Sequence, residues 1–374
     1  MNIMNSVERR EKRYLRRKEK RQDKIDIKSS NNSNINKIFT FKNVFDKARK
    51  CTRNVGYKKS TINFKLHMFS IVSKTCNDLK NNCYIVGDTY KFQINERGKI
   101  RDIDAPHIKD RLVHKVISND ILIPIFESKL IYDNGASSIG KGFSFTINRV
   151  KKLLRKWYLK HGMNGYIILI DFSKFFENCN HDVIKSIHNK YIKNEYTKKV
   201  IEDYLFVNDS GIALGIEIAQ REALMVPNKL DKMVINKAYS IVRYMDDSCF
   251  ICPTCEDAVN TLNEYIEISK GVNIVVNPKK TKIIHISKSF IFCKWKYQLL
   301  PNGKVVNIPA KDTIYRQRRK LNKMTKKNIN IEEIKTSIIS FCAYLNMGNS
   351  YKYINYLKGN ILLKFKNKKG FWCY

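Results

Sequence analysis

The sequence predicts an α+β fold, in which helices and strands alternate along the chain. Three observations support this. The apolar run YIILIDF (166–172) is typical of a buried strand. Segments on both sides of it repeat apolar residues with the period of a helix. The stretch SIVRYMDDSCFIC (240–252) has the composition of a strand, interrupted by two adjacent acids that indicate a strand–turn–strand. The 374 residues are enough for two or three domains with a real core.

The predicted helices follow in chain order. NRVKKLLRKWYLKHG (148–162) places its apolar residues on one stripe and its Lys and Arg residues on the others. HDVIKSIHNKYI (181–192) returns to the same period after the buried strand. A third helix, at 256–271, ends at Gly271, since glycine commonly closes helices.

The last third of the chain is predicted to be mixed. VNIVVNPKKTKIIHI (272–286) predicts two short strands around a turn at Asn277 and Pro278. KDTIYRQRRKLNKMTKKN (311–328) is typical of a basic helix that contacts a nucleic-acid backbone. The tyrosines of 340–357 have near-helical spacing, which favours packing over stacking on bases.

The charge of the chain favours a polyanionic partner. Lys and Arg number 71 against 34 Asp and Glu, which gives a formal net charge of +37. A coding bias toward Lys, Asn and Ile is the alternative, but it does not explain the many Arg or the few acids. The charged run at 9–24 is either a solvated helix or an arm that lies on phosphate. A flexible linker is predicted at 29–36.

Cysteine usage and hydropathy predict an intracellular protein. The ten cysteines have scattered spacing, and the chain does not begin with a secretory signal. We therefore expect reduced thiols and a cytoplasmic location. No apolar run approaches the roughly 20 residues of a membrane span, so no membrane partner is expected.

Three carboxylates are the candidate site. Asp171 ends the predicted buried strand, while Asp246 and Asp247 lie at the tip of the strand–turn–strand. If the two segments are neighbours, the acids meet at one edge of the sheet, where like charges raise each other's pKa. Divalent cations remove that cost, and two such ions about 3.5–4 Å apart activate a hydroxyl and stabilise a leaving pyrophosphate. The alternative is a solvated turn.

With these acids as anchors, a series of motifs resembles prokaryotic reverse transcriptases: retrons, diversity-generating retroelements, group II intron proteins and defence-associated groups. The agreement in order and spacing covers roughly residues 38–350. The segments that carry it are RYMDD (243–247), LIDFSKFFENCNHD (169–182), LGIEIAQ (214–220), NPKKTKI (277–283), FIFCKWKY (290–297), GKIRDIDAPHIKDRLVHKVI (98–117) and LIYDNGASSIGKGFSFTINRVKKLL (130–154). Departures are Ala219 in place of a common Ser, and FCK (292–294) in place of Phe-Leu-Gly.

The resemblance implies a right-hand polymerase with fingers, an antiparallel palm backed by helices, and a helical thumb. The implied divisions are a basic extension and linker at 1–37, fingers at 38–160, a palm at 161–288, and a primer grip with basic thumb at 289–374.

The resemblance also implies roles for individual residues. Asp171, Asp246 and Asp247 would be catalytic metal ligands, joined by the backbone carbonyl of Phe172, and Lys280 would protonate the leaving pyrophosphate. Phe176 would be a steric gate against a ribose 2′-hydroxyl. The remaining substrate contacts would come from Lys99, Arg101, Arg111, Gly215, Gln220 and Tyr244, and the primer grip from Phe292, Cys293 and Lys294. Solvated surface charge is the alternative for each cation, and core packing is the alternative for Phe176. His114 and His181 match histidines of relatives, and we expect both to be structural.

The implied function is RNA-directed DNA synthesis, in which a primer is extended with dNTPs with two Mg²⁺ ions, for which Mn²⁺ could substitute. The expected partners are template RNA, a DNA product or primer, and dNTPs, and the candidates beyond them are a dedicated non-coding RNA and a second protein encoded nearby. The implied setting is antiphage defence or a retroelement. Alternatives are a diversity-generating or retron enzyme without a defence role, an RNA-dependent RNA polymerase, and an RNA-binding palm without catalysis.

Overall fold

The computed structural model describes residue 16 and residues 35–357, except 97, 238 and 328. Within these residues, helices alternate with strands, and all pairings between the named strands are antiparallel. The predicted α+β fold with an antiparallel sheet is therefore confirmed. The predicted arm at 9–24 lies outside the described residues, except for residue 16, as does most of the predicted linker.

The chain forms two compact units, each assembled from segments far apart in the sequence. The first draws on Met1–Tyr132, Ser173–Lys232 and Glu267–Val275, and the second on Asp133–Phe172, Met233–Ile266 and Val276–Tyr374. Two helices, α12 (Asn228–Asn236) and α13 (Cys255–Lys270), contain residues of both units.

The first unit is mainly helical. Its helices are α2 (Ile35–Ile38), α3 (Phe41–Cys51), α4 (Lys59–Leu66), α5 (Met68–Lys80), α6 (Ile108–Val116), the π-helical turn η1 (Ile117–Leu122), α7 (Ile123–Phe126), α9 (His181–Tyr191), α10 (Glu195–Leu205) and α11 (Glu217–Met225). Several apolar side chains of α6 and η1 are fully buried, as at Leu112, Val113 and Ile121. One hairpin, β1 (Thr89–Glu96) with β2 (Lys99–Pro106), keeps most of its side chains exposed.

The second unit contains a four-stranded sheet that explains the apolar run at 166–172. Its strands are β3 (Tyr166–Ile170), β4 (Ile241–Tyr244), β5 (Asp247–Cys252) and β6 (Lys282–His285), in the order β4-β5-β3-β6. Because β3 has a neighbour on both sides, four of its five residues are buried. A central strand buried on both faces needs apolar residues at every position, and the sequence supplies them.

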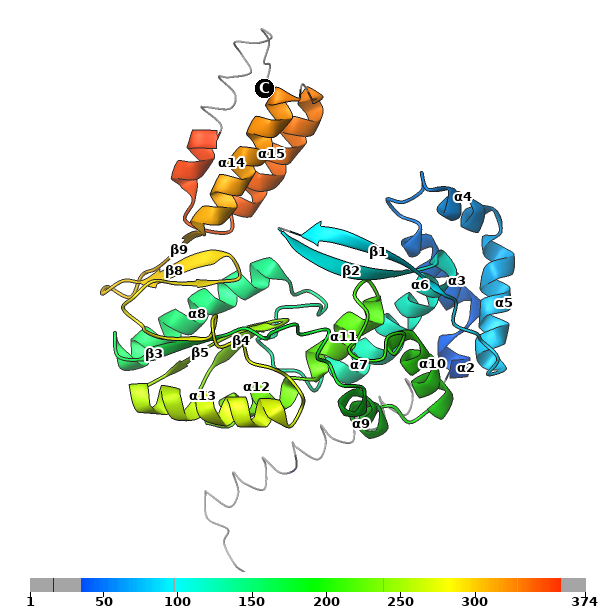
Figure 1. Ribbon diagram of the computed structural model, residues 1–374, viewed down its shortest axis with the longest axis horizontal. Helices are drawn as coiled ribbons and strands as arrows, with labels where there is room; N and C mark the ends of the chain where they lie inside the picture. Colours follow the sequence, from blue (N-terminus) through cyan, green and yellow to red (C-terminus); the bar gives the residue numbers. More distant parts are fainter. Residues whose placement is uncertain (1–15, 17–34, 97, 238, 328, 358–374) are drawn as a thin grey trace, which may run out of the picture. The chain divides into compact units, whose positions relative to one another are not determined.

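A second sheet shares its core with the first. It consists of β7 (Phe290–Phe292), β8 (Trp295–Leu299) and β9 (Val305–Pro309). The buried stripe of α8 (Phe143–His161) joins residues of both sheets in one apolar cluster, in which Trp295 is completely buried. Figure 1 shows α8 running along these strands. The helix predicted at 148–162 is thus present as part of α8, which begins earlier, at Phe143, and ends at His161.

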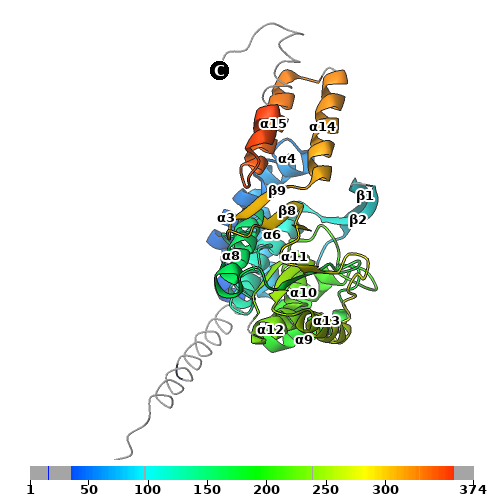
Figure 2. The ribbon, with the colours of Figure 1, turned by 90° about the vertical axis from the view of Figure 1, so that its left-hand side faces the viewer.

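The C-terminal helices α14 (Lys311–Lys326) and α15 (Ile331–Leu345) lie side by side, as Figures 1 and 2 show. They bury a small apolar cluster that includes Leu321 and Ile334. The basic helix predicted at 311–328 corresponds to α14. Tyr344 packs on Trp295, with ring centroids 5.1 Å apart, whereas Tyr351 is 75% exposed.

The prediction for 272–286 was only half right. Strand β6 forms after the turn, but before the turn only Val276 pairs, in an isolated bridge with Phe172. The reason is local: after α13 the backbone turns, with the Val272 and Asn273 N–H groups bonded back to Ser269 and Lys270. Too few extended residues then remain for a strand.

No helix in the described part of the chain is both long and apolar enough to cross a membrane.

Candidate active site

The hairpin of β4 and β5 places the paired acids of the YMDD stretch in the second unit. Tyr244 pairs with Asp247, so the connection consists of only Met245 and Asp246. Two-residue hairpin loops need positive φ at the first loop residue, and Met245 has φ 54°. A residue with a side chain adopts this conformation at a cost, which is a common feature of functional turns. The turn therefore holds Asp246 at the tip and Asp247 at the start of β5.

Arg243 holds this turn in place. Its side chain is fully buried, and its Nη1 donates a hydrogen bond to the Met245 carbonyl at 3.2 Å. Its backbone N–H donates to the Asp133 carbonyl at 3.1 Å, and its carbonyl accepts from the Gly135 N–H at 2.9 Å. Sequence reasoning assigned no role to Arg243, because a single Arg in a strand gives no sign that it is buried.

The strand register brings Asp171 to the same place. In the β3–β5 ladder the last pair is Ile170 with Ser248. One further step along both strands sets Asp171 opposite Asp247. The three acids thus converge within one unit, at one edge of one sheet.

Two side chains from the turn at 277–281 hold Asp171. The Lys280 Nζ lies 2.7 and 2.9 Å from the two carboxylate oxygens. The Asn277 Nδ2 donates to Oδ2 at 3.1 Å, and the Asn277 backbone N–H donates to the Asp171 carbonyl at 2.8 Å. Asn277 lies within a sequence motif, but the sequence alone gave it no role. Its carboxamide and backbone orient the first catalytic candidate, while Lys280 neutralises it.

The charges at this edge perturb each other. The pKa of Asp247 is raised to about 7, mainly by burial and then by the nearby Asp246 and Asp171 carboxylates, while Lys280 and Lys294 oppose the shift. The pKa of Lys280 is raised, chiefly by its hydrogen bond to Asp171. The ammonium group therefore stays protonated, and Asp247 carries a proton part of the time near neutral pH.

The acids fit a divalent cation chemically. Their donors are carboxylate oxygens, the ligands that small hard cations prefer. The raised pKa of Asp247 reflects burial first and the negative field of Asp246 and Asp171 second, and a cation would offset both. As they stand, the described residues contain no group of three or more His, Cys, Asp or Glu side chains arranged to hold an ion. The Lys280 ammonium instead supplies the positive charge at Asp171. Phe172, whose backbone carbonyl is expected to be a further ligand, directly follows Asp171 and pairs with Val276 in an isolated bridge.

The loop between β7 and β8 adjoins the acids. Its two residues, Cys293 and Lys294, both have positive φ (48° and 65°). Burial raises the pKa of the Cys293 thiol, and Asp247 is the next cause, which places the thiol near that carboxylate. Phe292 and Cys293 are buried in the core, so of the three predicted primer-grip residues only Lys294 has an exposed side chain. The half-buried Tyr244 ring meets Phe143 edge-on.

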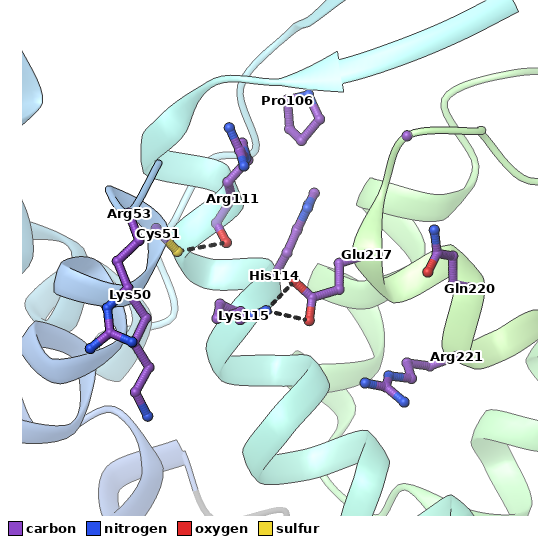
Figure 3. Close-up of a pocket in the computed structure, with 11 residues that line it drawn as sticks. Lys50, Cys51, Arg53, Pro106, Arg111, His114, Lys115, Glu217, Gln220 and Arg221 are labelled. Atoms are coloured by element: carbon purple, nitrogen blue, oxygen red, sulfur yellow. Dashed lines mark hydrogen bonds and ion pairs between the residues drawn. The ribbon is translucent and has the colours of Figure 1, made fainter. Parts of the chain in front are cut away.

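In the first unit, three predicted substrate residues line one hollow of about 410 Å³: Arg111, Gly215 and Gln220. Figure 3 shows Arg111 and Gln220 on two separate helices that face this hollow. Gly215 has φ 108°, and a Cβ there would lie 2.7 Å from the Asp104 carbonyl. The close approach to β2 therefore requires glycine.

Two other predicted cations are not part of that hollow. Lys99 and Arg101 lie on β2, where both are exposed. The Arg101 Nε lies 2.7 Å from a Glu96 carboxylate oxygen across the hairpin.

Phe176 is the more exposed member of an aromatic pair. Phe175 is buried, whereas Phe176 is half-buried, and the two rings meet edge-on at 5.6 Å. The core therefore uses Phe175, and burial alone does not account for Phe176. The His181 Nε2 lies 2.7 Å from the Gly211 carbonyl, a contact that suits the structural role expected of it.

Comparisons with known proteins identify a family. Residues 89–357 match the family model described as reverse transcriptase (RNA-dependent DNA polymerase). None of the curated proteins matches the chain.

Several solved structures are similar at low identity. Two are of apo telomerase from Candida tropicalis. The form truncated from its C-terminal domain has 14% identity, a TM-score of 0.45, and coverage of 58% of this chain and 54% of that chain. The other has 12% identity, a TM-score of 0.45, and coverage of 59% and 48%. Telomerase from Candida albicans, in complex with a TWJ fragment of telomeric RNA, has 11% identity, a TM-score of 0.49, and coverage of 81% and 63%. The chain thus spans about half to under two-thirds of these proteins.

Proposed function

The chain belongs to the reverse transcriptase (RNA-dependent DNA polymerase) family, and from that premise we propose that it extends a primer with dNTPs on an RNA template. The observation that carries the proposal is the meeting of Asp171, Asp246 and Asp247 at one sheet edge. A strained turn, a buried Arg and an Asn–Lys clamp all serve to position these acids. That arrangement is what nucleotidyl transfer with divalent cations needs.

In this proposal the three carboxylates hold two divalent cations, Mg²⁺ for preference and Mn²⁺ as a substitute, with the Phe172 carbonyl as a further ligand. Cations held there would supply activation of the primer hydroxyl and stabilisation of the leaving pyrophosphate. Asn277 keeps the Asp171 side chain oriented toward the site.

Lys280 holds the proton for the leaving group at its Nζ. Its protonated state at neutral pH favours a general-acid role. A cation at Asp171 would replace the charge that Lys280 now supplies, and the ammonium group would then be available to the pyrophosphate. This exchange of partners explains why a lysine is placed 2.7 Å from a metal-binding carboxylate.

The remaining predicted residues act on substrate and primer. Phe176 would exclude a 2′-hydroxyl, and its half-exposed ring supports this role. Contacts to the nucleotide or template are assigned to Lys99, Arg101, Arg111, Gly215, Gln220 and Tyr244. Lys294, the exposed residue of its turn, would contact the primer backbone.

For the biological role, we propose a cytoplasmic enzyme of the prokaryotic type that serves antiphage defence or a retroelement and uses a dedicated non-coding RNA. The formal net charge of +37 supports a stable RNA partner. A second protein encoded nearby is a further expected partner. An RNA-dependent RNA polymerase is the alternative activity, and Phe176 argues against it.

Sequencing of the nucleic acid that co-purifies with the chain tests this proposal. The control is the double variant Asp246→Ala, Asp247→Ala. One abundant RNA with both proteins, and its complementary DNA only with wild type, is the expected result. The same mixed RNA with both proteins, and no DNA with either, would count against the polymerase and favour an RNA-binding role.

A further inference from the structure

Tyr344, near the end of α15, packs against two apolar clusters at once. One is the small cluster of the C-terminal helices, and the other is the cluster that the two sheets share with α8. The Tyr344 ring lies 5.8 Å from the ring of Phe341 on the first side and 5.1 Å from the fully buried Trp295 on the second, measured between centroids. Aromatic rings about 4.5–7 Å apart attract each other. Tyr344 therefore joins the C-terminal helices to the sheets.

The same ring begins a series of aromatic contacts that leads to the paired acids. Tyr344 stacks on Phe143, the first residue of α8, with centroids 5.9 Å apart and planes inclined by 26°. Phe143 meets Tyr244 edge-on, again at 5.9 Å. Tyr244 pairs with Asp247 across the hairpin and directly precedes the strained turn that carries Asp246. We call Tyr344, Phe143 and Tyr244 the aromatic path, and all three belong to the second unit.

The hydroxyl group of Tyr344 makes a second contact near the acids. It donates a hydrogen bond at 3.5 Å to the carbonyl of Lys294, in the turn between β7 and β8. This distance is longer than that of a usual O–H to oxygen hydrogen bond, so the contact is weak. The ring of Tyr344, rather than its hydroxyl, is therefore expected to provide most of the support.

The chain just after α15 is fixed to the second sheet, which gives Tyr344 a rigid base. A Cβ at Gly348 would overlap the Trp295 ring and lie 2.7 Å from the Asn307 carbonyl oxygen, so the close contact requires glycine. The Asn349 N–H donates to the Asn307 carbonyl at 2.7 Å, and its Oδ1 accepts from the Asn307 N–H at 3.0 Å. Rigid elements hold a functional residue more precisely than loops do.

On its other side, α15 lies beside α14, the basic helix predicted to contact a nucleic-acid backbone. The two helices share the buried cluster that includes Leu321 and Ile334. The Gln317 side chain of α14 also donates to Ser337 of α15, at 3.1 Å to its Oγ and 3.4 Å to its carbonyl. Tyr344 thus lies between a helix expected to contact nucleic acid and the acids expected to perform the chemistry.

We propose that Tyr344 is a positioning residue, which holds the turn of Asp246 in place through Phe143 and Tyr244. The proposal rests on the proposed polymerase function and adds to it a residue that contacts neither substrate nor metal. Tyr344 restrains the Phe143 ring, Phe143 restrains Tyr244, and Tyr244 is the residue from which the turn begins. A misplacement of about 1 Å in a reacting group can cost a factor of about 100 in rate. Loss of the support should therefore slow chemistry more than it weakens binding.

The first test compares wild type, Tyr344→Leu and Tyr344→Phe in single-turnover extension of a labelled primer on an RNA template. Leu removes the ring contacts, and a rate loss of about tenfold is expected, the equivalent of one strong aromatic contact. Phe keeps the ring and should retain most of the wild-type rate. The Kd for primer–template, measured by fluorescence anisotropy, should be unchanged in both variants. A weaker Kd with an unchanged rate would overturn the proposal.

The matched control is Tyr353→Leu. Tyr353 is half-buried like Tyr344 and packs against the cluster of the C-terminal helices, but in the described chain it is not part of the cluster of the two sheets. Both Leu variants are expected to melt at a lower temperature than wild type, and only Tyr344→Leu is expected to lose rate. Equal rate losses in the two variants would mean that destabilisation is the cause, and would overturn the proposal.

Phe143→Leu tests whether the aromatic path acts as one unit. If Tyr344 acts through Phe143, the double variant Phe143→Leu, Tyr344→Leu should lose little more rate than either single variant. Rate losses that multiply in the double variant would show that the two residues act independently, which contradicts the path.

Amide hydrogen exchange examines the same contacts without catalysis. Tyr344→Leu should speed exchange in the segment 241–252, which contains β4, the turn and β5, whereas Tyr353→Leu should leave it unchanged. Unchanged exchange of this segment in Tyr344→Leu would refute the support of the turn. Absence of primer extension by wild type would instead refute the proposed polymerase, and the exchange rates would still decide whether Tyr344 holds the turn.

Discussion

In the cation-free protein, the negative charge of Asp247 is unfavourable because the group is buried and lies near two other carboxylates. With its pKa raised to about 7 by burial, Asp246 and Asp171, the folded chain binds a proton more tightly than the unfolded chain, where Asp has a pKa of about 3.9. Stability of the cation-free protein should therefore fall as pH rises from about 4 to about 7, and remain lower above that range. This loss of stability is the cost of burying Asp247 close to two other carboxylates, as a cation-binding site requires.

The first prediction follows from that cost. At pH 8 in a chelator, Asp247→Asn should melt at a higher temperature than wild type, because the amide removes the repelling charge. Addition of Mg²⁺ should raise the melting temperature of wild type more than that of the variant. Thermal unfolding by circular dichroism measures both. A variant that melts lower than wild type in the chelator would show that Asp247 is not under electrostatic strain.

Lys280 is the second residue with a testable role. Lys280→Gln should lower kcat by roughly 100-fold or more, the usual contribution of a general acid, while primer–template affinity is unchanged. The neighbouring Lys279→Gln is the control, since Lys279 is exposed and no contact of its side chain to Asp171 exists in the described structure. Single-turnover rates separate chemistry from binding. Equal rates for both variants would leave Lys280 as a structural counter-ion only.

Phe176 and Phe175 provide a matched aromatic pair. Phe176→Val should increase incorporation of ribonucleotides relative to deoxyribonucleotides, because the half-exposed ring is removed. Phe175→Ala should destabilise the fold by about 3–5 kcal/mol, as core truncations do, and leave sugar selectivity unchanged. The ratio of kcat/KM for the two nucleotide types is the measurement. A changed ratio in the Phe175 variant alone would make Phe175, rather than Phe176, the residue that selects the sugar.

At the scale of secondary-structure elements, sequence pattern and composition predicted the strands and helices whose formation depends on local sequence. The sequence predicted β3, the β4–β5 hairpin and α13. A strand buried on two faces gives a continuous apolar run, and an amphipathic helix gives a helical period of apolar residues. The strand expected before Asn277 was not formed, since the turn after α13 takes up its first residues. Turn chemistry of this kind depends on the preceding helix and is not visible in composition.

The site was predicted unevenly for the same reason. Motif spacing found the three acids and Lys280. The support of Arg243 for the turn at Met245 and Asp246, and the clamp of Asn277 on Asp171, depend on register and burial. The hollow is less visible still, because Lys50 and Gln220 meet there from segments far apart in the chain.

A buried ionic cluster ties α9, α10 and α11 together in the first unit. His188 is fully buried, with its Nδ1 3.0 Å from Glu202 and its Nε2 3.1 Å from the fully buried Glu222. Burial alone would lower the pKa of His188, but the two carboxylates outweigh it and raise the pKa. The charged ring therefore stabilises α11, the helix that carries Gln220.

The fourth prediction concerns this cluster. Because the folded pKa of His188 is raised, its stabilisation is complete below about pH 6.5, the ordinary value, and is lost as pH rises through the folded pKa. His188→Gln should cost about 3–5 kcal/mol at pH 6, since it leaves Glu222 buried and unpaired. Urea unfolding as a function of pH measures this. The double variant with Glu222→Gln should recover part of the loss, and no recovery would mean that the charge pair is not the cause.

At the scale of the whole molecule, the net charge and the family match indicate the same class of binding partner. The formal net charge of +37 predicts strong, salt-sensitive binding of a polyanion, and the family match over residues 89–357 accounts for that partner as a nucleic acid. Composition could indicate the class of partner. It could not indicate which nucleic acid is bound, because attraction between a basic surface and phosphates does not depend on sequence.

The central claim is that these carboxylates drive RNA-directed DNA synthesis. The most direct measurement is extension of a labelled DNA primer on an RNA template with dNTPs and Mg²⁺, by wild type and by Asp246→Asn. Extension by wild type that a chelator abolishes, and none by the variant, is the predicted result. Equal extension by both proteins, or extension that persists in the chelator, would contradict the account.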